Sequence, residues 1–216
     1  MTGNLYLLRH GQTEWAMSGQ YTGLTDIPLT ETGREQAKNA GERLRSMHPD
    51  EFIEIITSPS QRAIMTAELA GYACHVDSRA HEWDYGRAEG NTRQTISRLI
   101  GHEWDIWKDG TNLIPVCDET SERIETINNQ SIHIQPTDGE TLNDAYERAN
   151  TLIESIKPAL DKSDVLIVAH SHIIRILATA WLHVNPLIAQ HLELGTAEIA
   201  VLGEHKGTPV IKKWGC

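Results

Sequence analysis

The sequence predicts an α/β fold: a three-layer α/β/α sandwich with a mostly parallel central sheet. Three apolar runs carry this prediction, at residues 5–8, 52–57 and 164–169, and each gives way to polar residues and then to a turn or a helical pattern. Short apolar runs of this kind are typical of strands that are buried on both faces, as in parallel sheets. Their alternation with helical stretches indicates helices on both sides of the sheet.

Helical spacing fills the stretches between these runs. At residues 30–47 the apolar residues recur at helical intervals, and Thr32 and Glu35 have the spacing of a capping box. Residues 59–71 form the next expected helix, because proline is tolerated in a first helical turn. The remaining expected elements are a short strand at 74–76, a helix from Thr141 that ends near Pro158, a helix at 173–178, and a closing hairpin of residues 197–202 and 209–214 with Gly203 and Gly207 in its turn region.

The stretch from about residue 84 to residue 140 has no regular period. It holds Trp104 and Trp107, scattered prolines and several polar clusters. Long irregular segments of compact domains often carry function. We therefore expect a single domain over residues 1–216, in which this stretch is an inserted cap over the carboxyl edge of the sheet.

The composition limits the classes of partner. The net charge of −11 argues against nucleic acid and anionic membranes. We expect no membrane span and no secretory signal, because no apolar run is long enough and the start of the chain lacks the pattern. The three scattered cysteines suit a reducing compartment, so a cytoplasmic location is expected. The closing hairpin could pair across a two-fold axis, which leaves a homo-oligomer open.

The first apolar run ends abruptly in Arg9, His10 and Gly11. Ligands of open α/β sheets bind at the carboxyl edge of the strands, and glycine there allows the backbone to approach a ligand closely. A guanidinium beside an imidazole suits a phosphate, because arginine supplies a fork of donors and histidine can attack phosphorus. A strand end with two incidental polar residues explains the tripeptide equally well when it is taken alone.

A second strand ends in the same manner. The run at 164–169 leads into His170, Ser171 and His172. If this strand lies beside the first in a parallel sheet, His10 and His170 face each other across one pocket. The pairing of two such strand ends makes a functional site the better interpretation.

The third strand leads into a helix start that also favours an anion. Ser58 follows the run at 52–57, and Arg62 lies about one turn into the helix after it. A helix N-terminus and an arginine both attract negative charge. Arg62 could therefore face the same edge as the two histidines.

A proton donor for the leaving oxygen is expected in the irregular segment of residues 81–90. Cleavage of a phosphomonoester releases an alkoxide, and a carboxyl group near the bridging oxygen can protonate it. Glu82, Asp84 and Glu89 all qualify, and the residue pattern does not choose among them.

Several motifs together resemble the histidine phosphatase superfamily, also called the phosphoglycerate mutase-like family, over nearly the whole chain. They are Arg9–Trp15, Tyr21–Gly23, Pro28–Gly33, Thr57–Pro59 with Arg62, Thr66 and Ala67, Glu82–Gly86 with Glu89 and Gly90, and Ala169–His170. The resemblance implies a phosphatase that works through a phosphohistidine, without a metal or other cofactor, on a small phosphorylated metabolite.

The resemblance also implies roles for individual residues. His10 would be the phosphorylated nucleophile, and Glu82 the proton donor. Arg9, Arg62 and His170 would hold the phosphoryl oxygens. The expected substrate-binding residues are Thr13, Gln20, Tyr21, Thr22, Gly23, Ser58, Tyr85 and Ser171.

Two departures from the family pattern bear on the activity. The asparagine that usually follows the motif tryptophan is Ala16 here, so one phosphate donor is replaced. The loop typical of mutases is absent and Tyr85–Asn91 stands in its place, which favours a phosphatase. The nearest residues that could supply the missing donor are Gln20, Tyr21 and Thr22.

The resemblance extends to one branch of the family. Residues 11–26, 82–86 and 107–110 look like the sedoheptulose bisphosphatase branch, so a sugar bisphosphate such as sedoheptulose bisphosphate is the expected kind of substrate. A second phosphate would need further cations, although each basic residue taken alone fits an ordinary solvated position. The candidates are Arg87, Arg93, Arg98 and Lys108.

Three other functions stay open. A phosphoglycerate mutase would keep the phosphohistidine but return the phosphate to its substrate. A metallohydrolase could use His10 with His170 and His172, because residues two apart on a strand face the same side, but the nearby arginines argue against a cation. A phosphate-binding protein without catalysis would more often lack His10 or Glu82. His172 itself is expected to begin a helix and to tune His170 rather than to react.

Overall fold

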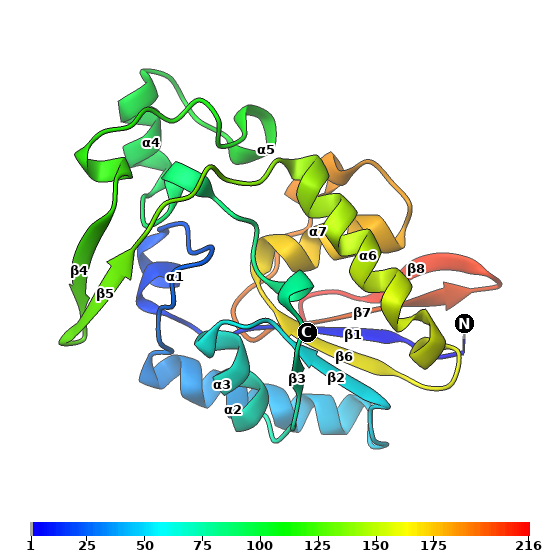
Figure 1. Cartoon of the computed structure of the whole chain (residues 1–216). Coiled ribbons are helices and arrows are strands. Elements are labelled where there is room, and N and C mark those ends of the chain that lie inside the picture. The colour runs from blue at the N-terminus through cyan, green and yellow to red at the C-terminus, as the bar shows by residue number, and fades with distance from the viewer. Residues whose placement is uncertain (1) are drawn as a thin grey trace.

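The computed structural model describes residues 2–216. Its centre is a six-stranded sheet in the order β3–β2–β6–β1–β7–β8. The parallel neighbours are β3 (His75–Val76), β2 (Glu54–Thr57), β6 (Val165–Ala169) and β1 (Leu5–Arg9), while β7 (Ile199–His205) is antiparallel to β1 and β8 (Thr208–Lys213) is antiparallel to β7. The predicted mostly parallel sheet is confirmed (Figure 1).

Helices cover both faces of this sheet (Figure 1). One face carries α2 (Glu31–Met47) and α3 (Gln61–Leu69), and the other carries α6 (Leu142–Leu160) and α7 (Ser171–Trp181). The predicted α/β sandwich is therefore also confirmed. Among the described residues, no helix is both long and apolar enough to cross a membrane.

The side chains of β1 alternate between the two cores. Leu5 and Leu7 lie in the core under α6 and α7, whereas Tyr6 and Leu8 lie in the core under α2 and α3. Alternate residues of a strand point to opposite faces, so a strand covered on both faces has to be apolar throughout. This requirement explains why the run could be identified as a strand in the sequence.

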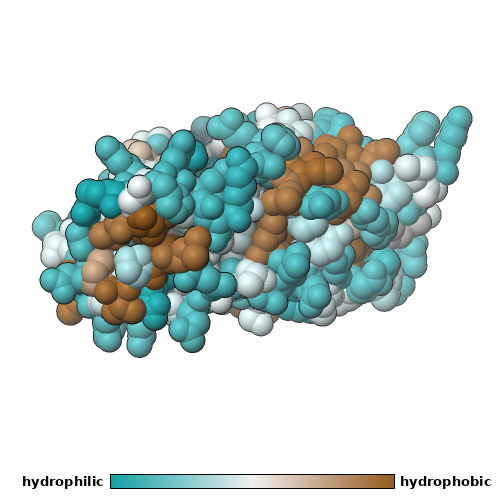
Figure 2. Space-filling model, turned by 90° about the horizontal axis from the view of Figure 1, so that it is seen from above, coloured by the Kyte–Doolittle hydropathy of each residue, from teal (hydrophilic) through white to brown (hydrophobic). Residues whose placement is uncertain are grey.

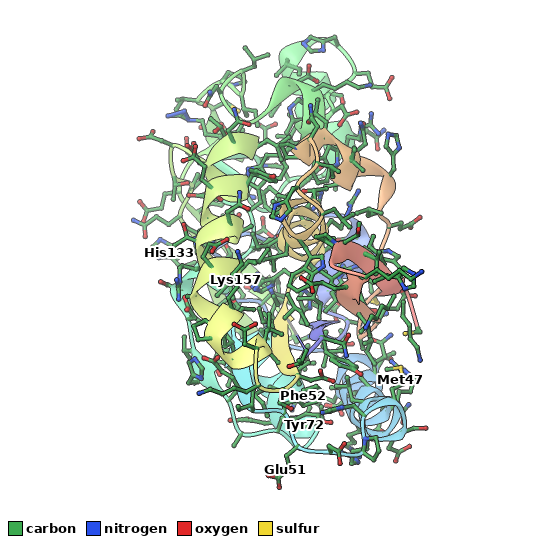
Figure 3. All side chains as sticks on the ribbon, turned by 90° about the vertical axis from the view of Figure 1, so that its right-hand side faces the viewer. Met47, Glu51, Phe52, Tyr72, His133 and Lys157 are labelled. Atoms are coloured by element: carbon green, nitrogen blue, oxygen red, sulfur yellow. The ribbon has the colours of Figure 1, made fainter. Side chains whose placement is uncertain are left out.

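Aromatic packing closes the end of the sheet that lies opposite the carboxyl edge. The ring of Phe52 lies 5.1 Å from that of Tyr6, 4.3 Å from that of His48 and 5.7 Å from that of Tyr72, centroid to centroid. Figure 3 shows Phe52 and Tyr72 together near Met47, the last residue of α2. This packing stabilises the sheet at a distance from the strand ends that carry the histidines.

The cap of one helix and the start of the next differ from the prediction, whereas the predicted helix at 30–47 is present. Thr30, not Thr32, caps α2, because its hydroxyl oxygen accepts a hydrogen bond of 3.0 Å from the backbone N–H of Gly33. The next helix begins after Pro59, at Gln61. Threonine and serine are effective caps only at the first non-helical position, so the cap moves with the true start of the helix.

Of two expectations nearer the C-terminus, the first is confirmed, because Pro158 lies near the end of α6, which continues to Leu160. The second is wrong in part. Gly203 lies within β7 opposite Val210, and the turn of the hairpin is Lys206–Gly207, where both residues have positive φ angles of 52° and 79°. Positive φ at both central residues is typical of the two-residue hairpin turns that match strand twist.

The segment between β3 and α6 consists of short elements at the carboxyl end of the sheet (Figure 1). They are η1 (Ser78–Ala80), η2 (Gly86–Ala88), α4 (Arg93–Ile100), α5 (Ile106–Asp109), η3 (Asp118–Thr120) and a two-stranded sheet of β4 (Arg123–Ile127) and β5 (Gln130–Ile134). Seen from above, the surface of the molecule is mainly hydrophilic and carries two separate hydrophobic areas (Figure 2).

The β4–β5 hairpin was not predicted. Asn128 and Asn129 form its turn with positive φ angles of 50° and 62°, and asparagine is one of the residues that tolerate this conformation. Ile132 and Ile134 pack against Trp15 of α1 (Glu14–Ser18). The turn signal was present in the sequence, but the weak apolar alternation of the strands obscured it.

Candidate active site

The parallel pairing of β1 with β6 brings two histidines together. Arg9 is in register with Ala169, so His10 and His170 leave neighbouring strands at the same edge. Their ring centroids lie 5.2 Å apart, with the ring planes inclined at 60°. Both side chains are buried. The expected juxtaposition of His10 and His170 is therefore present in the structure.

His10 is held with one ring nitrogen free to react. Its backbone N–H donates to the carbonyl of Ala169 at 2.9 Å, and its carbonyl accepts from the N–H of Ala197 at 3.1 Å. Its Nδ1 lies 2.7 Å from the carbonyl oxygen of Gly11. A carbonyl oxygen can only accept, so Nδ1 carries the hydrogen of the neutral ring and Nε2 keeps a lone pair.

The charge state of His10 suits a nucleophile. Burial, and then the charges of Arg62 and Arg9, hold the pKa of His10 well below its usual value. The ring is therefore neutral at neutral pH, and a neutral imidazole with a free lone pair can attack an electrophile.

Gly11 permits a close approach between two segments of backbone at this site. A Cβ atom at Gly11 would lie 2.3 Å from the carbonyl oxygen of Gly33. The N–H of Gly11 donates to the hydroxyl of Thr66 at 3.0 Å. The turn after His10 is thus fixed to the start of α2 and to α3, which limits the movement of the imidazole.

His170 carries its ring hydrogen on the other nitrogen from His10. Its Nδ1 accepts from Nε of Arg62 at 3.1 Å, so the neutral ring carries its hydrogen on Nε2. Nε2 lies 2.7 Å from the hydroxyl oxygen of Ser58. Burial, and then the charge of Arg62, hold the pKa of His170 well below its usual value. His170 therefore presents an N–H donor where His10 presents a lone pair.

Arg62 is fully buried and connects three parts of the site. Besides the bond to His170, its Nη1 donates to the carbonyl of Thr25 at 2.8 Å, and its Nη2 donates to the carbonyls of Thr22 at 3.1 Å and Gly23 at 2.8 Å. These carbonyls belong to the loop that follows α1. Arg62 thus fixes the loop relative to the histidines.

Arg9 supplies positive charge with an unused donor. Its Nη1 donates to the carbonyl of Leu194 at 2.6 Å. Its Nε is buried and has no hydrogen-bond partner among the described residues. A buried donor without a partner costs free energy, and an anion beside Arg9 would satisfy it.

The structure distinguishes the three candidate acids by their partners. Oε1 of Glu82 accepts from the backbone N–H groups of Trp83 at 2.9 Å and Ile173 at 2.8 Å, and its Oε2 accepts from the N–H of His172 at 3.1 Å. Glu82 lines the same cavity as His10. A carboxyl group there is in a position to protonate a leaving oxygen.

The other two carboxylates support the backbone instead. Asp84 accepts from the hydroxyl of Thr137 at 2.6 Å and from the N–H of Gly86 at 3.0 Å. Glu89 accepts from the N–H groups of Gly23 and Thr25 at about 3.0 Å. Neither lines the cavity of His10, so the geometry favours Glu82 among the three.

A cavity of about 250 Å³ opens at this edge of the sheet. Eight of the predicted site residues line it: Arg9, His10, Gln20, Tyr21, Thr22, Glu82, Tyr85 and Ser171. Trp15, Ala16, Gly19 and His172, which were not among the predicted site residues, line it as well. The three residues proposed to replace the missing asparagine thus share one wall with Ala16.

The remaining predicted residues lie behind this wall. Arg62, His170 and Ser58 form the buried hydrogen-bonded group described above. The hydroxyl of Thr13 caps α1 by accepting from the N–H of Ala16 at 3.1 Å. A Cβ atom at Gly23 would lie 2.6 Å from Oε2 of Glu89, so glycine is required there for packing. A substrate contact by these residues stays a prediction.

The cations suggested for a second phosphate lie elsewhere. Arg93 bonds to the carbonyl of Trp104 and to Glu103, Arg98 pairs with Glu119, and Lys108 pairs with Asp105. Arg87 lines a separate cavity of about 390 Å³. None of the four lines the cavity of His10.

The geometric basis of the metallohydrolase alternative is wrong. His170 is the N-cap of α7 and His172 lies in the first turn of that helix, so the two are not alternate residues of a strand. The ring of His170 bonds to Arg62 and Ser58, whereas the ring of His172 bonds to Tyr85 at 2.6 Å.

Comparison with known proteins places this chain in a family. The family model described as "Histidine phosphatase superfamily (branch 1)" matches residues 5–216. An acid phosphatase of Mycobacterium tuberculosis is 32% identical over 94% of this chain and 87% of its own length. The sedoheptulose 1,7-bisphosphatase of Saccharomyces cerevisiae is 35% identical over 84% of this chain and 68% of its own.

Other similar proteins include mutases and a solved structure. A 2,3-bisphosphoglycerate-dependent phosphoglycerate mutase of Lactobacillus acidophilus is 30% identical over 97% of this chain and 96% of its own. The solved structure of an open-reading-frame product from Mycobacterium tuberculosis is 29% identical, with a TM-score of 0.83 over 100% of this chain and 98% of that one. The predicted family is confirmed: the chain belongs to the histidine phosphatase superfamily (branch 1) and is a phosphatase enzyme.

Proposed function

We propose that this protein is a metal-independent phosphomonoesterase, which transfers the phosphoryl group of a small phosphorylated metabolite to His10 and then to water. The observation that carries the proposal is the hydrogen bond from Nδ1 of His10 to the carbonyl of Gly11, since it leaves the lone pair of Nε2 available. Glu82 and Arg9 share the cavity with that ring. A nucleophile, an acid and a cation are thereby within reach of one phosphate.

In the first step, Nε2 of His10 forms a bond to phosphorus while the bond from phosphorus to the leaving oxygen breaks. Glu82, in its protonated form, gives its proton to the leaving oxygen. Arg9, Arg62 and the Nε2–H of His170 stabilise the charge on the equatorial oxygens. For Arg62 and His170 this contact requires their present donors to turn from the loop carbonyls and Ser58 toward the phosphate.

In the second step, water attacks phosphorus and the bond to Nε2 breaks. The Glu82 carboxylate accepts the proton of the water, which restores the acid for the next cycle. Inorganic phosphate leaves, and the lone pair returns to His10. Water is the only reactant besides the phosphate ester that the two steps require.

We propose a sugar bisphosphate such as sedoheptulose bisphosphate as the first substrate to test. The yeast relative of that name and the matching sequence stretches support it. The absence of Arg87, Arg93, Arg98 and Lys108 from the cavity wall means that a second phosphate would extend beyond this wall. The mutase relatives favour a second candidate function, transfer of phosphate back to a phosphoglycerate.

The test is phosphate release from a panel of substrates in the presence of a chelator. The panel contains sedoheptulose bisphosphate, fructose bisphosphate, 3-phosphoglycerate and an aryl phosphate. His10→Ala is the inactive control, and His102→Ala, at an exposed histidine that does not line the cavity, is the matched active control. Release that survives the chelator and is lost only in His10→Ala supports the proposal.

Three other outcomes would contradict parts of it. Formation of 2-phosphoglycerate from 3-phosphoglycerate without phosphate release would support the mutase instead. Loss of activity with the chelator, restored by added metal, would overturn the metal-independent mechanism. Release from the aryl phosphate alone would keep the mechanism and overturn the sugar bisphosphate as substrate.

A further inference from the structure

The Nδ1 hydrogen of His10 is held by the carbonyl of a glycine. Nδ1 lies 2.7 Å from the carbonyl oxygen of Gly11. Glycine has no Cβ atom, so its backbone is the least restrained of all residues. Packing still requires glycine here, because a Cβ atom would lie 2.3 Å from the carbonyl oxygen of Gly33. The direction of the Gly11 carbonyl therefore depends on hydrogen bonds made by the peptide groups on either side.

The peptide group that precedes Gly11 is held at both ends. Its oxygen, which is the carbonyl oxygen of His10, accepts from the N–H of Ala197 at 3.1 Å. Its N–H, which is that of Gly11, donates to the hydroxyl of Thr66 at 3.0 Å. Because a peptide group is planar, these two bonds set the orientation of the whole group and of the chain that enters Gly11.

The hydroxyl of Thr66 is oriented for this contact by its own helix. Its hydrogen goes to the carbonyl oxygen of Arg62 at 2.7 Å, one turn earlier in α3. A hydroxyl has one hydrogen and two lone pairs, so toward Gly11 the oxygen of Thr66 can only accept. Thr66 is fully buried. The contact is therefore fixed in direction and shielded from competing water.

The peptide group that follows Gly11 is held by a second helix. This group carries the carbonyl oxygen that receives the Nδ1 hydrogen of His10, and its N–H is that of Gln12. The N–H donates to Oε1 of Gln36, in α2, at 2.9 Å. In a trans peptide the N–H and the C=O point in opposite directions. By holding the N–H, Gln36 directs the Gly11 carbonyl toward His10.

We propose that Thr66 and Gln36 are positioning residues, which fix the ring hydrogen of His10 on Nδ1 through the backbone of Gly11. The inference rests on the proposed function, in which His10 attacks phosphorus through the lone pair of Nε2. Neither side chain lines the cavity of His10, so each acts through the backbone. A rotated Gly11 carbonyl would leave Nδ1 without its acceptor. The hydrogen would then be free to move to Nε2, where it blocks the lone pair.

Helix α3 thereby determines the hydrogen positions of both histidines. Arg62, in its first turn, donates to Nδ1 of His170 and so places the hydrogen of that ring on Nε2. Thr66, one turn later, acts on His10 through Gly11 and places the hydrogen on Nδ1. The contact to His170 does not pass through the Thr66 hydroxyl. Removal of that hydroxyl should thus change the ring of His10 and leave the ring of His170 as it is.

The test is NMR of the histidine rings, labelled with a heavy nitrogen isotope, in the wild type and in Thr66→Val at neutral pH. Ring nitrogens with a hydrogen and those with a lone pair have different chemical shifts, and the signals of His10 are those lost in His10→Ala. Valine keeps the shape of threonine without the hydroxyl. We expect the Nε2–H form of His10 to appear, and kcat for phosphate release to fall about tenfold. KM should change less than kcat, because the phosphate donors remain.

Matched variants separate the hydrogen bonds from packing. Thr66→Ser keeps the hydroxyl and should keep the wild-type tautomer and rate. Thr179→Val is the control, since Thr179 is also buried and its hydroxyl also donates to a carbonyl of its own helix, that of Ile176 at 2.7 Å. It should change neither the His10 ring nor kcat. Gln36→Met, at a partly exposed position, should reproduce the effect of Thr66→Val, and Gln36→Glu, which keeps an acceptor, should reverse it.

Each contrary result has a distinct meaning. If His10 keeps its hydrogen on Nδ1 and kcat stays near the wild-type value in Thr66→Val and Gln36→Met, the inference is wrong and the proposed function stands. If Thr66→Ser behaves like Thr66→Val, or Thr179→Val changes the His10 ring equally, the effect is one of packing and the inference is also wrong. Should Thr66→Val not fold, Gln36→Met decides by the same two measurements. A wild type that shows the expected tautomers but releases no phosphate would overturn the proposed function and, with it, the role of these contacts in catalysis.

Discussion

His10 and His170 are the same kind of side chain at equivalent places in the fold, yet their surroundings are opposite. Each follows a buried strand at the carboxyl edge, and the two strands are parallel neighbours. His10 gives its Nδ1 hydrogen to the adjacent carbonyl of Gly11, so that a lone pair faces outward on Nε2. His170 accepts at Nδ1 from Arg62, so that its Nε2 carries a hydrogen.

The difference shows that the partner of one ring nitrogen assigns the role of the other. A backbone carbonyl produces a nucleophile, and a guanidinium produces a donor. Burial and Arg62 keep both rings neutral, so the contrast is one of hydrogen placement and not of charge. The two histidines can therefore be tested against each other.

The largest effect is expected for His10→Ala. Removal of the atom that forms the bond to phosphorus should lower kcat by at least about 10⁴-fold, as removal of a nucleophile does in other hydrolases. The measurement is steady-state phosphate release together with trapping of an acid-labile phosphoenzyme. Activity within tenfold of the wild type would refute the assignment of His10, while His102→Ala should keep full activity.

His170→Ala should be less severe and different in kind. Loss of one donor to the developing charge costs about 10²–10³-fold in kcat, but the bond to His10 can still form. A phosphoenzyme should therefore be trapped in His170→Ala and not in His10→Ala. If the two variants behave alike in the trapping experiment, the contrast between donor and nucleophile is wrong.

His10 and His170 should contribute equally to the pH dependence of the protein's free energy of unfolding. Their pKa values are lowered in the folded state, so as the pH falls below about 6.5 the unfolded chain gains a proton on each and the folded chain does not. The free energy of unfolding should then fall by about 1.4 kcal/mol per pH unit for each histidine.

Urea unfolding at about pH 7.5 and pH 5.5 would measure this dependence. His10→Ala and His170→Ala should each lose less stability on acidification than the wild type, by similar amounts. His102→Ala should lose as much as the wild type, because that ring is exposed. If acidification lowers the free energy of unfolding by different amounts in the two variants, one of the two rings is already charged in the folded state.

The smallest effect is expected for Ser58→Ala. The hydroxyl of Ser58 is the present partner of the His170 Nε2–H, and its loss removes one neutral hydrogen bond of about 1 kcal/mol. We expect a change in kcat/KM of less than about tenfold, with no change in the phosphoenzyme trapped. A loss as large as that in His170→Ala would mean that Ser58 itself binds the phosphate.

The sheet and the two histidines could be predicted from the sequence, because the strands are uninterrupted apolar runs and each histidine follows one of them. A buried parallel strand has to be apolar on both sides, so its end is sharply marked by Arg9 or by His170. The residue pattern could not select Glu82 over Asp84 and Glu89, because all three lie in an irregular segment. The hydrogen-bond donors that distinguish them include residues far away in the sequence, which are Ile173 for Glu82, Thr137 for Asp84 and Gly23 for Glu89.

The cavity wall was predicted less completely than the catalytic edge. Arg87, Arg93, Arg98 and Lys108 are basic residues near the right segments. In the structure, however, three of them pair with acids or carbonyls of the segment between β3 and α6, and Arg87 lines another cavity. His172 was visible in the sequence, and only the placement of Tyr85 beside it gives it a chemical partner.

The order in which the chain is made has a consequence for when the site can exist. The backbone carbonyl of His10 is held by Ala197, and Arg9 is held by the carbonyl of Leu194, 185 positions further along. During translation Arg9 and His10 leave the ribosome long before the segment that fixes them, because Leu194 is 185 residues further along the chain than Arg9. Contacts of such long range form late. A nascent chain is therefore expected to be inactive toward phosphate esters until the segment that contains Leu194 and Ala197 has been synthesised.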